Sequence, residues 1–308
     1  MTITITTSNV NGIRAAKRKG IEQWAAKNTP DVWCMQEVRA PQNEIDPIFD
    51  EFGFEYATAG RIADQSGLDR MNEICRIKGR AGVGLLSALP VIDKRYGLPG
   101  LAEDVDSGRW IEADVKTPQG YTVTVVCVYV HAGNTDDPEK MKQKYRFLDT
   151  MLVRMGQLRD EAAHGGKQAV LCGDFNIAHT PLDIKNAKAN EKHAGFLPEE
   201  RAYVDKWLGE LEFVDVMRSL CGDIQGPYTW WSQRGRAFDN NVGWRIDYQF
   251  RNGPRIRHRQ SSDLRPAMVG PCAAEHHLRR VSFCGRHPAN AGQREDTLRF
   301  PARIKHGC

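Results

Sequence analysis

The stretch AVLCGDFN, residues 169–176, decides how this chain is organised, because an apolar run leads directly into polar side chains. The apolar half is typical of a strand, and Gly173 ends it. Asp174 and Asn176 follow two positions apart, which directs both side chains to one side of an extended chain. A carboxylate beside a carboxamide suits a site that takes a proton from water and holds a phosphate oxygen or a hard cation. The same pattern is also typical of an ordinary turn, so its meaning depends on the other strand ends.

Those other strand ends carry polar side chains of the types that a phosphodiester site requires. Three strand-like runs end at Asn9, Glu37 and Tyr129, and Asp247 lies in a fourth, residues 244–248. A phosphodiester site with one Mg²⁺ needs a carboxylate ligand, a second carboxylate to activate water, and amides and a phenol to hold the charge on the phosphate. Together these residues predict a hydrolytic site at a common edge of the strands.

The composition is that of a globular chain with a substantial core, since 41% of its 308 residues are hydrophobic. The first residues have neither the basic nor the apolar region of a secretory signal, and no apolar run reaches the length of a membrane span. Eight cysteines are scattered without a CxxC pair, which favours buried free thiols over disulfides or a zinc site. We therefore expect a cytoplasmic protein that does not bind membranes.

Helix and strand patterns alternate along residues 1–250 without a repeat or a linker. Helical spacing predicts three helices, over residues 13–27, 140–164 and 199–211. Alternation predicts a hairpin of residues 109–115 and 121–130 and a further strand over residues 213–217. We therefore expect one mixed α/β domain over residues 1–250.

Nine segments of the chain carry a family resemblance when they are taken in order: Ser8–Arg14, Gln36–Glu37, Gly108–Trp110, Tyr129, Gly173–Ala178, Pro181–Asn186, Gly195–Arg201, Tyr228–Trp231 and Trp244–Tyr248. Together they resemble the exonuclease III-type apurinic/apyrimidinic endonucleases of the endonuclease/exonuclease/phosphatase superfamily. The resemblance implies a four-layer α/β sandwich, in which two mixed β-sheets pack face to face between helices. The sixth and seventh segments resemble the DNA-repair branch and argue against a relative that acts on lipids or small phosphates.

The resemblance also implies a metal site. Glu37 would be the principal Mg²⁺ ligand, and Mn²⁺ is an alternative ion. Asn9, Asp174 and Asn176 would complete the network of metal ligands and hydrogen bonds.

Catalytic and DNA-binding roles are implied in the same way. Asp174 would activate the attacking water, and Asn176 and Tyr129 would contact the scissile phosphate. Asp247 would orient a catalytic histidine. The residues that would contact DNA or shape its groove are Asn11, Arg14, Asp183, Asn186, Trp230 and Trp231. A tryptophan pair on its own is more often packed in a core than used to stack bases. The charged end of the helix, Arg14 with Lys17, Arg18 and Lys19, could meet phosphates, although such an end is usually only solvated.

The implied reaction is Mg²⁺-dependent hydrolysis of double-stranded DNA by a monomer. Its expected forms are incision 5′ to an abasic site, removal of 3′-blocking groups, and 3′→5′ exonuclease action.

The resemblance stops near residue 250. The family closes with a Ser-Asp-His motif, which neither Ser262–Leu264 nor Glu275–His277 reproduces, so the expected catalytic histidine and its aspartate are absent from this sequence. Residues 251–308 carry 12 basic residues, 11 of them Arg, against 4 acidic residues. When residues 265–281 are read one nucleotide later, the codons permit Trp-Ser-Asp-His-Ala-Pro.

We therefore interpret residues 251–308 as a frameshifted basic tail that is poorly ordered, and we expect the last strand of the fold to be lost. An Arg-rich arm that binds DNA is the alternative interpretation of this tail. The corresponding alternative for the whole chain is a catalytically impaired DNA-binding protein that keeps the groove.

Overall fold

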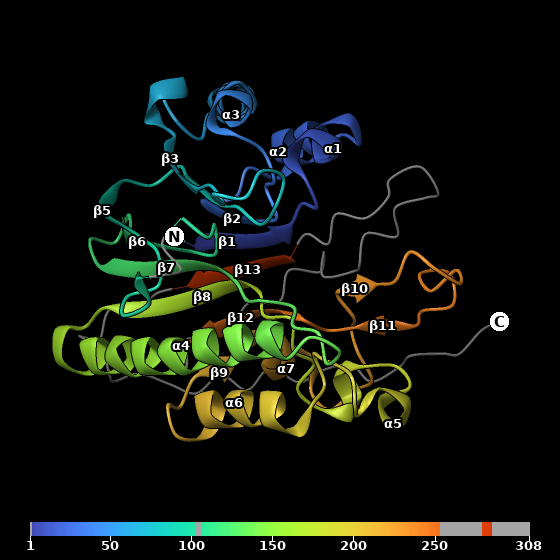
Figure 1. Cartoon of the computed structure of the whole chain (residues 1–308). Coiled ribbons are helices and arrows are strands. Elements are labelled where there is room, and N and C mark those ends of the chain that lie inside the picture. The colour runs from blue at the N-terminus through green and yellow to red at the C-terminus, as the bar shows by residue number, and fades with distance from the viewer. Residues whose placement is uncertain (1, 103–105, 253–278, 285–308) are drawn as a thin grey trace, which may run out of the picture.

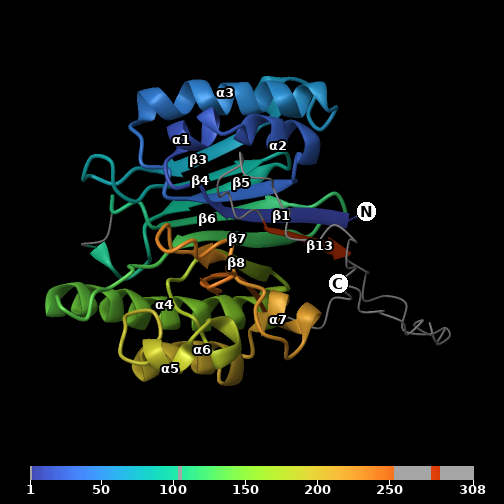
Figure 2. The ribbon, with the colours of Figure 1, turned by 90° about the vertical axis from the view of Figure 1, so that its right-hand side faces the viewer.

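Two mixed β-sheets lie face to face, with helices on the outer face of each (Figure 1, Figure 2). The computed structural model describes residues 2–102, 106–252 and 279–284. The predicted four-layer α/β sandwich is therefore confirmed. Within these three ranges, no helix is both long and apolar enough to cross a membrane.

The first sheet has the strand order β13-β1-β2-β4-β3. Its strands are β1 (Thr2–Asn9), β2 (Val32–Gln36), β3 (Asp69–Glu73), β4 (Val83–Ser87) and β13 (Arg279–Cys284). The first two strands are parallel, and the remaining pairs are antiparallel. Because β1 and β2 are parallel neighbours, the residues that follow them emerge at the same end of the sandwich.

Three helices cover the outer face of this sheet: α1 (Ile13–Arg18), α2 (Ile21–Asn28) and α3 (Gln42–Thr58). A short 3₁₀ turn, η1 (Gln65–Gly67), follows. The prediction of one continuous helix over residues 13–27 was wrong, because Gly20 adopts a left-handed conformation (φ 86°) that separates α1 from α2. Helix α3 was not predicted, although its buried apolar side chains recur at helical spacing.

The second sheet has the order β5-β6-β7-β8-β12-β9. Its strands are β5 (Val91–Tyr96), β6 (Trp110–Lys116), β7 (Thr122–Tyr129), β8 (Gln168–Asp174), β9 (Val214–Asp215) and β12 (Asp247–Arg251). The predicted hairpin is confirmed as β6 and β7. The strand predicted over residues 213–217 is shorter, because the Asp215 carboxylate accepts a hydrogen bond from the Arg218 amide at 3.0 Å and starts a helix there.

The outer face of the second sheet is covered by α4 (Pro138–Gly165), α6 (Pro198–Gly209) and α7 (Val216–Cys221), with α5 (Ala187–Asn190) beside them. The two longest correspond to the predicted helices 140–164 and 199–211. The side chain of Asp137 caps the start of α4, and Gly166 ends it in a left-handed conformation.

Apolar cores fill the three interfaces between the four layers. Cys34, Cys127 and Cys172 lie in the core between the sheets, each two or three residues before a candidate site residue. They are free thiols, as predicted for the cysteines that fall within the described residues. A tightly packed apolar interior thus supports each strand end that carries site chemistry.

We expected the last strand of the fold to be lost, but a strand, β13, is present at the edge of the first sheet. Strand β13 pairs antiparallel with β1, and Ile5 lies opposite Val281 while Ile3 lies opposite Phe283. Val281 and Phe283 alternate with polar residues in the sequence, as strand residues do, and their pairing covers the open edge of β1. Arg251, which ends β12, and Asn252 are also described, and both are buried. Residues 253–278 and 285–308, which include Ser262–Leu264 and Glu275–His277, lie outside the described residues. The division at residue 250 therefore stays a prediction.

Candidate active site

The ends of five strands meet at one end of the sandwich. Asn9 closes β1, and Glu37 follows β2, its parallel neighbour. In the second sheet, Tyr129 lies opposite Asp174 in the β7–β8 pair, and Asp247 lies opposite Asp174 in the β8–β12 pair. The register therefore brings five of the six predicted catalytic and metal-site residues to these strand ends, and the sixth, Asn176, follows Asp174.

The amide of Asn9 joins the two sheets at this edge. Its Nδ2 donates hydrogen bonds to Glu37 Oε1 at 3.0 Å and to Asp174 Oδ2 at 3.0 Å. The phenol of Tyr129 donates to the same Glu37 Oε1 at 2.8 Å. Four of the predicted residues thus form one hydrogen-bonded group.

Glu37 adopts an unusual backbone conformation, with φ of 54°. Non-glycine residues reach this region only when their surroundings hold them there, and such residues concentrate at functional sites. The Glu37 carboxylate also forms an ion pair with Arg39, whose guanidinium donates to Asn11 Oδ1 at 2.8 Å. Arg39 was not singled out from the sequence, although a cation two residues after the predicted ligand was a usable signal.

Asn176 does not lie extended beside Asp174 as predicted. Strand β8 ends at Asp174, and Asn176 turns into the left-handed region with φ of 51°. Its main-chain amide donates to Asp174 Oδ1 at 2.9 Å, and its side-chain Nδ2 donates to the Val130 carbonyl at 2.9 Å. The stretch therefore forms a turn, and this turn orients the Asp174 carboxylate, while its role in a catalytic site stays a prediction.

Burial and like charges shape the protonation of the site. Burial raises the pKa of Asp174 well above its usual range, and the nearby carboxylates of Asp247 and Glu37 raise it further. The Asn176 amide and the Asn9 side chain oppose this rise in part. Burial, together with the charges of Glu37 and Asp174, also raises the pKa of Tyr129, so its phenol stays a hydrogen-bond donor.

The chemistry of these donors fits a divalent cation. Three carboxylates, Glu37, Asp174 and Asp247, concentrate negative charge where burial already disfavours it, and hard oxygen ligands are those that Mg²⁺ prefers. Asn9 and Asn176 use their amide NH₂ groups to hold the carboxylate and the loop. Although these oxygens suit the ion chemically, no three His, Cys, Asp or Glu side chains among the described residues are arranged so that they could hold an ion without other ligands. An ion bound here would therefore keep water or phosphate ligands, as is usual for Mg²⁺.

Lys144 is a buried lysine that holds the backbone of Asn176, and it was not predicted from the sequence. Its Nζ donates to the carbonyls of Ala132 at 3.1 Å and Asn176 at 2.9 Å and lies 2.5 Å from a carboxylate oxygen of Glu200. Burial lowers the pKa of Lys144, while the charge of Glu200 acts against this. A lysine three residues before Phe147 on the apolar stripe of α4 was the available signal.

An aromatic hairpin lies beside the strand ends. Strands β10 (Trp230–Trp231) and β11 (Gly243–Trp244) pair antiparallel, and the rings of Trp230 and Trp244 meet edge-on at 6.4 Å. Trp230 is 42% exposed, whereas Trp231 is half-buried against Phe238, with ring centroids 5.1 Å apart. Trp230 is therefore available to a ligand, while Trp231 stabilises the hairpin.

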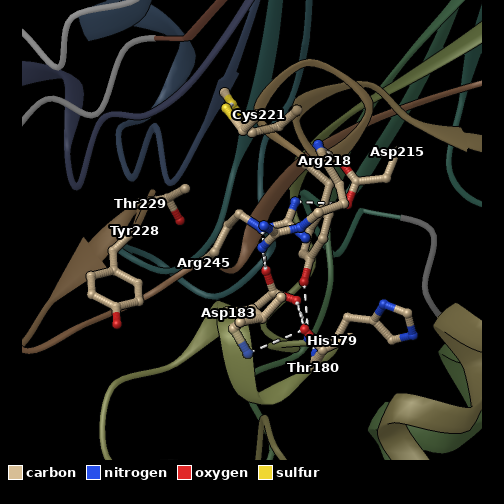
Figure 3. Close-up of polar contacts among 12 residues, drawn as sticks. His179, Thr180, Asp183, Asp215, Arg218, Cys221, Tyr228, Thr229 and Arg245 are labelled. Atoms are coloured by element: carbon tan, nitrogen blue, oxygen red, sulfur yellow. Dashed lines mark hydrogen bonds and ion pairs between the residues drawn. The ribbon is translucent and has the colours of Figure 1, made fainter. Parts of the chain in front are cut away.

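The remaining residues predicted to contact DNA divide into two kinds. Arg14 and Asn186 are exposed, and Asn11 carries the Arg39 hydrogen bond at the rim of the site. Asp183 instead is fully buried, so it can shape a groove only through the residues that it holds. Figure 3 shows it directed at the guanidinium of Arg245.

Known proteins resemble both the sequence and the fold. A family model described as "Endonuclease/Exonuclease/phosphatase family" matches residues 6–270. An exodeoxyribonuclease of Bacillus subtilis is 30% identical over 241 residues, which is 78% of this chain and 84% of the relative. The structure of an AP endonuclease from Archaeoglobus fulgidus is similar with a TM-score of 0.71 and 26% identity, over 91% of this chain and 98% of that one. A 3′ phosphatase from Neisseria bound to product DNA hairpin is similar with a TM-score of 0.70 and 25% identity, over 92% of this chain and 100% of that one.

Proposed function

The chain belongs to the endonuclease/exonuclease/phosphatase family, and from this premise we propose that it is a Mg²⁺-dependent DNA-repair phosphodiesterase of exonuclease III type. Its expected activities are 3′→5′ exonuclease action and incision at abasic sites. The observation that carries the proposal is the hydrogen-bonded group of Asn9, Glu37, Tyr129 and Asp174 across the two sheets.

Asp174 is the residue that takes the proton from water in this proposal. Its raised pKa makes the ionised carboxylate a strong proton acceptor, and the Asn9 and Asn176 hydrogen bonds hold it in one orientation. Tyr129 keeps its proton and can donate to a phosphate oxygen as negative charge develops there.

Glu37 and Asp174 would hold the ion, with Asn9 setting the spacing between them. When bound, Mg²⁺ supplies charge stabilisation to the phosphate oxygens. The Glu37 carboxylate also accepts hydrogen bonds from Asn9 and Tyr129 and pairs with Arg39, and these contacts help to hold it in place.

Double-stranded DNA with an abasic site or a free 3′ end is the proposed substrate, bound by a monomer. Trp230 offers an exposed ring beside the strand ends, and base or sugar stacking on such a ring contributes about 1–3 kcal/mol. Arg14 is 56% exposed and can meet a phosphate.

A missing histidine lowers the expected rate. The Ser-Asp-His motif implied by the family resemblance is absent from the sequence, and loss of one positioned acid–base or charge-stabilising group costs about 10²–10⁴-fold. We therefore expect slow turnover, and restoring the reading frame after residue 250 should raise it. Resequencing of the gene in this region tests the frameshift itself, because an intact frame would remove the basis for that interpretation.

A panel of substrates tests the proposed function. The chain is incubated with an abasic duplex, a recessed 3′ end and a phosphoinositide, each with Mg²⁺ and with EDTA. We expect cleavage of the two DNA substrates with Mg²⁺ alone. Binding of DNA that is insensitive to EDTA and never followed by cleavage would favour the impaired DNA-binding protein, and phosphoinositide hydrolysis would place the chain in another branch.

A further inference from the structure

We propose that Asp183 is a positioning residue, whose buried carboxylate fastens the loop 177–184 to the start of β12 and thereby sets Asp247 opposite Asp174. This inference rests on the proposed function, since it assigns a role in that site. It replaces the expectation that Asp183 contacts DNA.

The carboxylate of Asp183 has its contacts inside the protein. Oδ1 accepts from Arg245 Nε at 2.7 Å and forms an ion pair with Arg218. Oδ2 accepts from both the amide and the hydroxyl of Thr180 at 2.9 Å. The side chain is fully buried, so both oxygens are committed to the loop and to the two arginines (Figure 3).

Arg245 passes this constraint to the strand. Its main-chain amide donates to the Asp183 carbonyl at 2.7 Å, and its guanidinium lies 2.7 Å from a carboxylate oxygen of Asp215. The same guanidinium lies 4.4 Å from the centre of the Tyr248 ring. The Tyr248 hydroxyl in turn donates to the Ile177 carbonyl at 2.8 Å. The loop is therefore held at one end by Arg245, two residues before β12, and at the other end by Tyr248 within β12.

Thr229 fixes the two residues that follow Arg245, namely Ile246 and the first residue of β12, Asp247. Its hydroxyl oxygen accepts from the amides of Ile246 at 2.9 Å and Asp247 at 3.1 Å, and its own amide donates to the Trp244 carbonyl at 2.7 Å. The backbone that presents Asp247 is thus held by side chains on both sides. Its partner across the ladder is Asp174, the proposed base.

A second buried carboxylate supplies a matched control. Asp114 is 3% exposed and accepts from Arg95 at 2.8 Å and Thr124 at 2.7 Å, with Lys167 at 3.1 Å. Thr124 lies five positions before Tyr129 on β7, which places Asp114 about 17 Å from the strand ends at 3.3–3.4 Å per residue. Loss of either carboxylate weakens a buried ion cluster, but Asp183 alone of this pair adjoins the site.

The experiment compares Asp183→Asn with Asp114→Asn by steady-state kinetics on an abasic duplex and by hydrogen exchange of residues 244–250. Both variants should melt at lower temperature. Below those temperatures, we expect kcat of Asp183→Asn to fall on the order of 10²-fold with little change in KM, and its 244–250 amides to exchange faster. Asp114→Asn should keep kcat within about twofold and leave these amides unchanged.

Equal kcat in the two variants would overturn the proposal, as would a rise in KM alone, which would make Asp183 a DNA contact. If the wild type cleaves no duplex, the proposed function fails. The positioning role is then tested by hydrogen exchange alone, and similar exchange rates of the 244–250 amides in the two variants would refute it. If Asp183→Asn does not fold, Thr229→Val and Thr229→Ser take its place. The valine variant should lose kcat and the serine variant keep it, and equal loss would count against the proposal.

Discussion

Replacing Lys144 with Met is expected to destabilise the fold by about 3–5 kcal/mol, because it leaves the buried carboxylate of Glu200 without its cation. Both side chains are 0% exposed, and their charged atoms lie 2.5 Å apart. The change also removes the donor to the carbonyls of Ala132 and Asn176. For a domain of this size, about 2–4 °C of Tm per kcal/mol gives a fall of about 6–20 °C.

The assay is urea denaturation at pH 7, supported by thermal melting. The double variant Lys144→Met, Glu200→Gln should recover at least half of the lost stability, because the uncompensated charge is gone. The glutamine oxygen can still accept from the Gly195 amide, which lies 2.6 Å from the carboxylate in the wild type. Lys142→Met is the matched control, since that side chain is 75% exposed on the same helix, and it should change stability by less than about 0.5 kcal/mol.

Two results would refute the reasoning. A loss below about 1 kcal/mol for Lys144→Met would mean that the pair behaves as an exposed one. A double variant as unstable as the single one would mean that the uncompensated carboxylate is not the cause.

Three further predictions concern the site and its support. Tyr129→Phe removes the hydrogen bond to Glu37 and should lower kcat on an abasic duplex by about 10–10³-fold with KM nearly unchanged; an unaltered kcat would exclude a role for the phenol. Trp230→Ala should weaken DNA binding by about 1–3 kcal/mol, as measured by fluorescence anisotropy. The melting temperature of the protein should not show a loss of stability of the same size. Burial alone would raise the pKa of Asp183, but the arginines Arg245 and Arg218 outweigh it and hold the pKa at about 2. Because this value lies below that of an unfolded aspartate, about 3.9, the ionised group should contribute about 2–3 kcal/mol to the free energy of unfolding above pH 4, and this contribution should disappear as the pH falls from about 4 to 2. Urea denaturation at several pH values, with Asp183→Asn as the comparison, measures this loss, and identical pH profiles for the two proteins would contradict it.

Local patterns in the sequence predicted the strand ends well. Asn9, Glu37, Tyr129 and Asp174 each close or follow a strand whose apolar pattern is legible, and the family resemblance predicted how the two sheets bring them together. Alternation and helical spacing are properties of neighbouring residues, so they can be recognised in the sequence without knowledge of the tertiary fold.

The supporting residues could not be predicted in this way. Lys144 acquires its role from Glu200, which lies 56 positions later, and Asp183 from Arg245, which lies 62 positions later. Asn176 turns away from the extended conformation because its amide and side chain find partners at Asp174 and Val130. Such contacts depend on the packing of whole elements. The helical spacing of Lys144 indicates that it is buried, but no spacing in the sequence identifies the partner of Lys144, Asp183 or Asn176.

The most direct test of the site is single-turnover incision of an abasic duplex by Asp174→Asn and by the wild type, with DNA binding measured in parallel. We predict that the wild type incises with Mg²⁺ and not with EDTA. We predict that the variant binds equally well but incises about 10²–10⁴-fold more slowly. Equal incision rates for the two proteins, or wild-type incision that persists in EDTA, would contradict the assignment of the strand ends as a metal-dependent nuclease site.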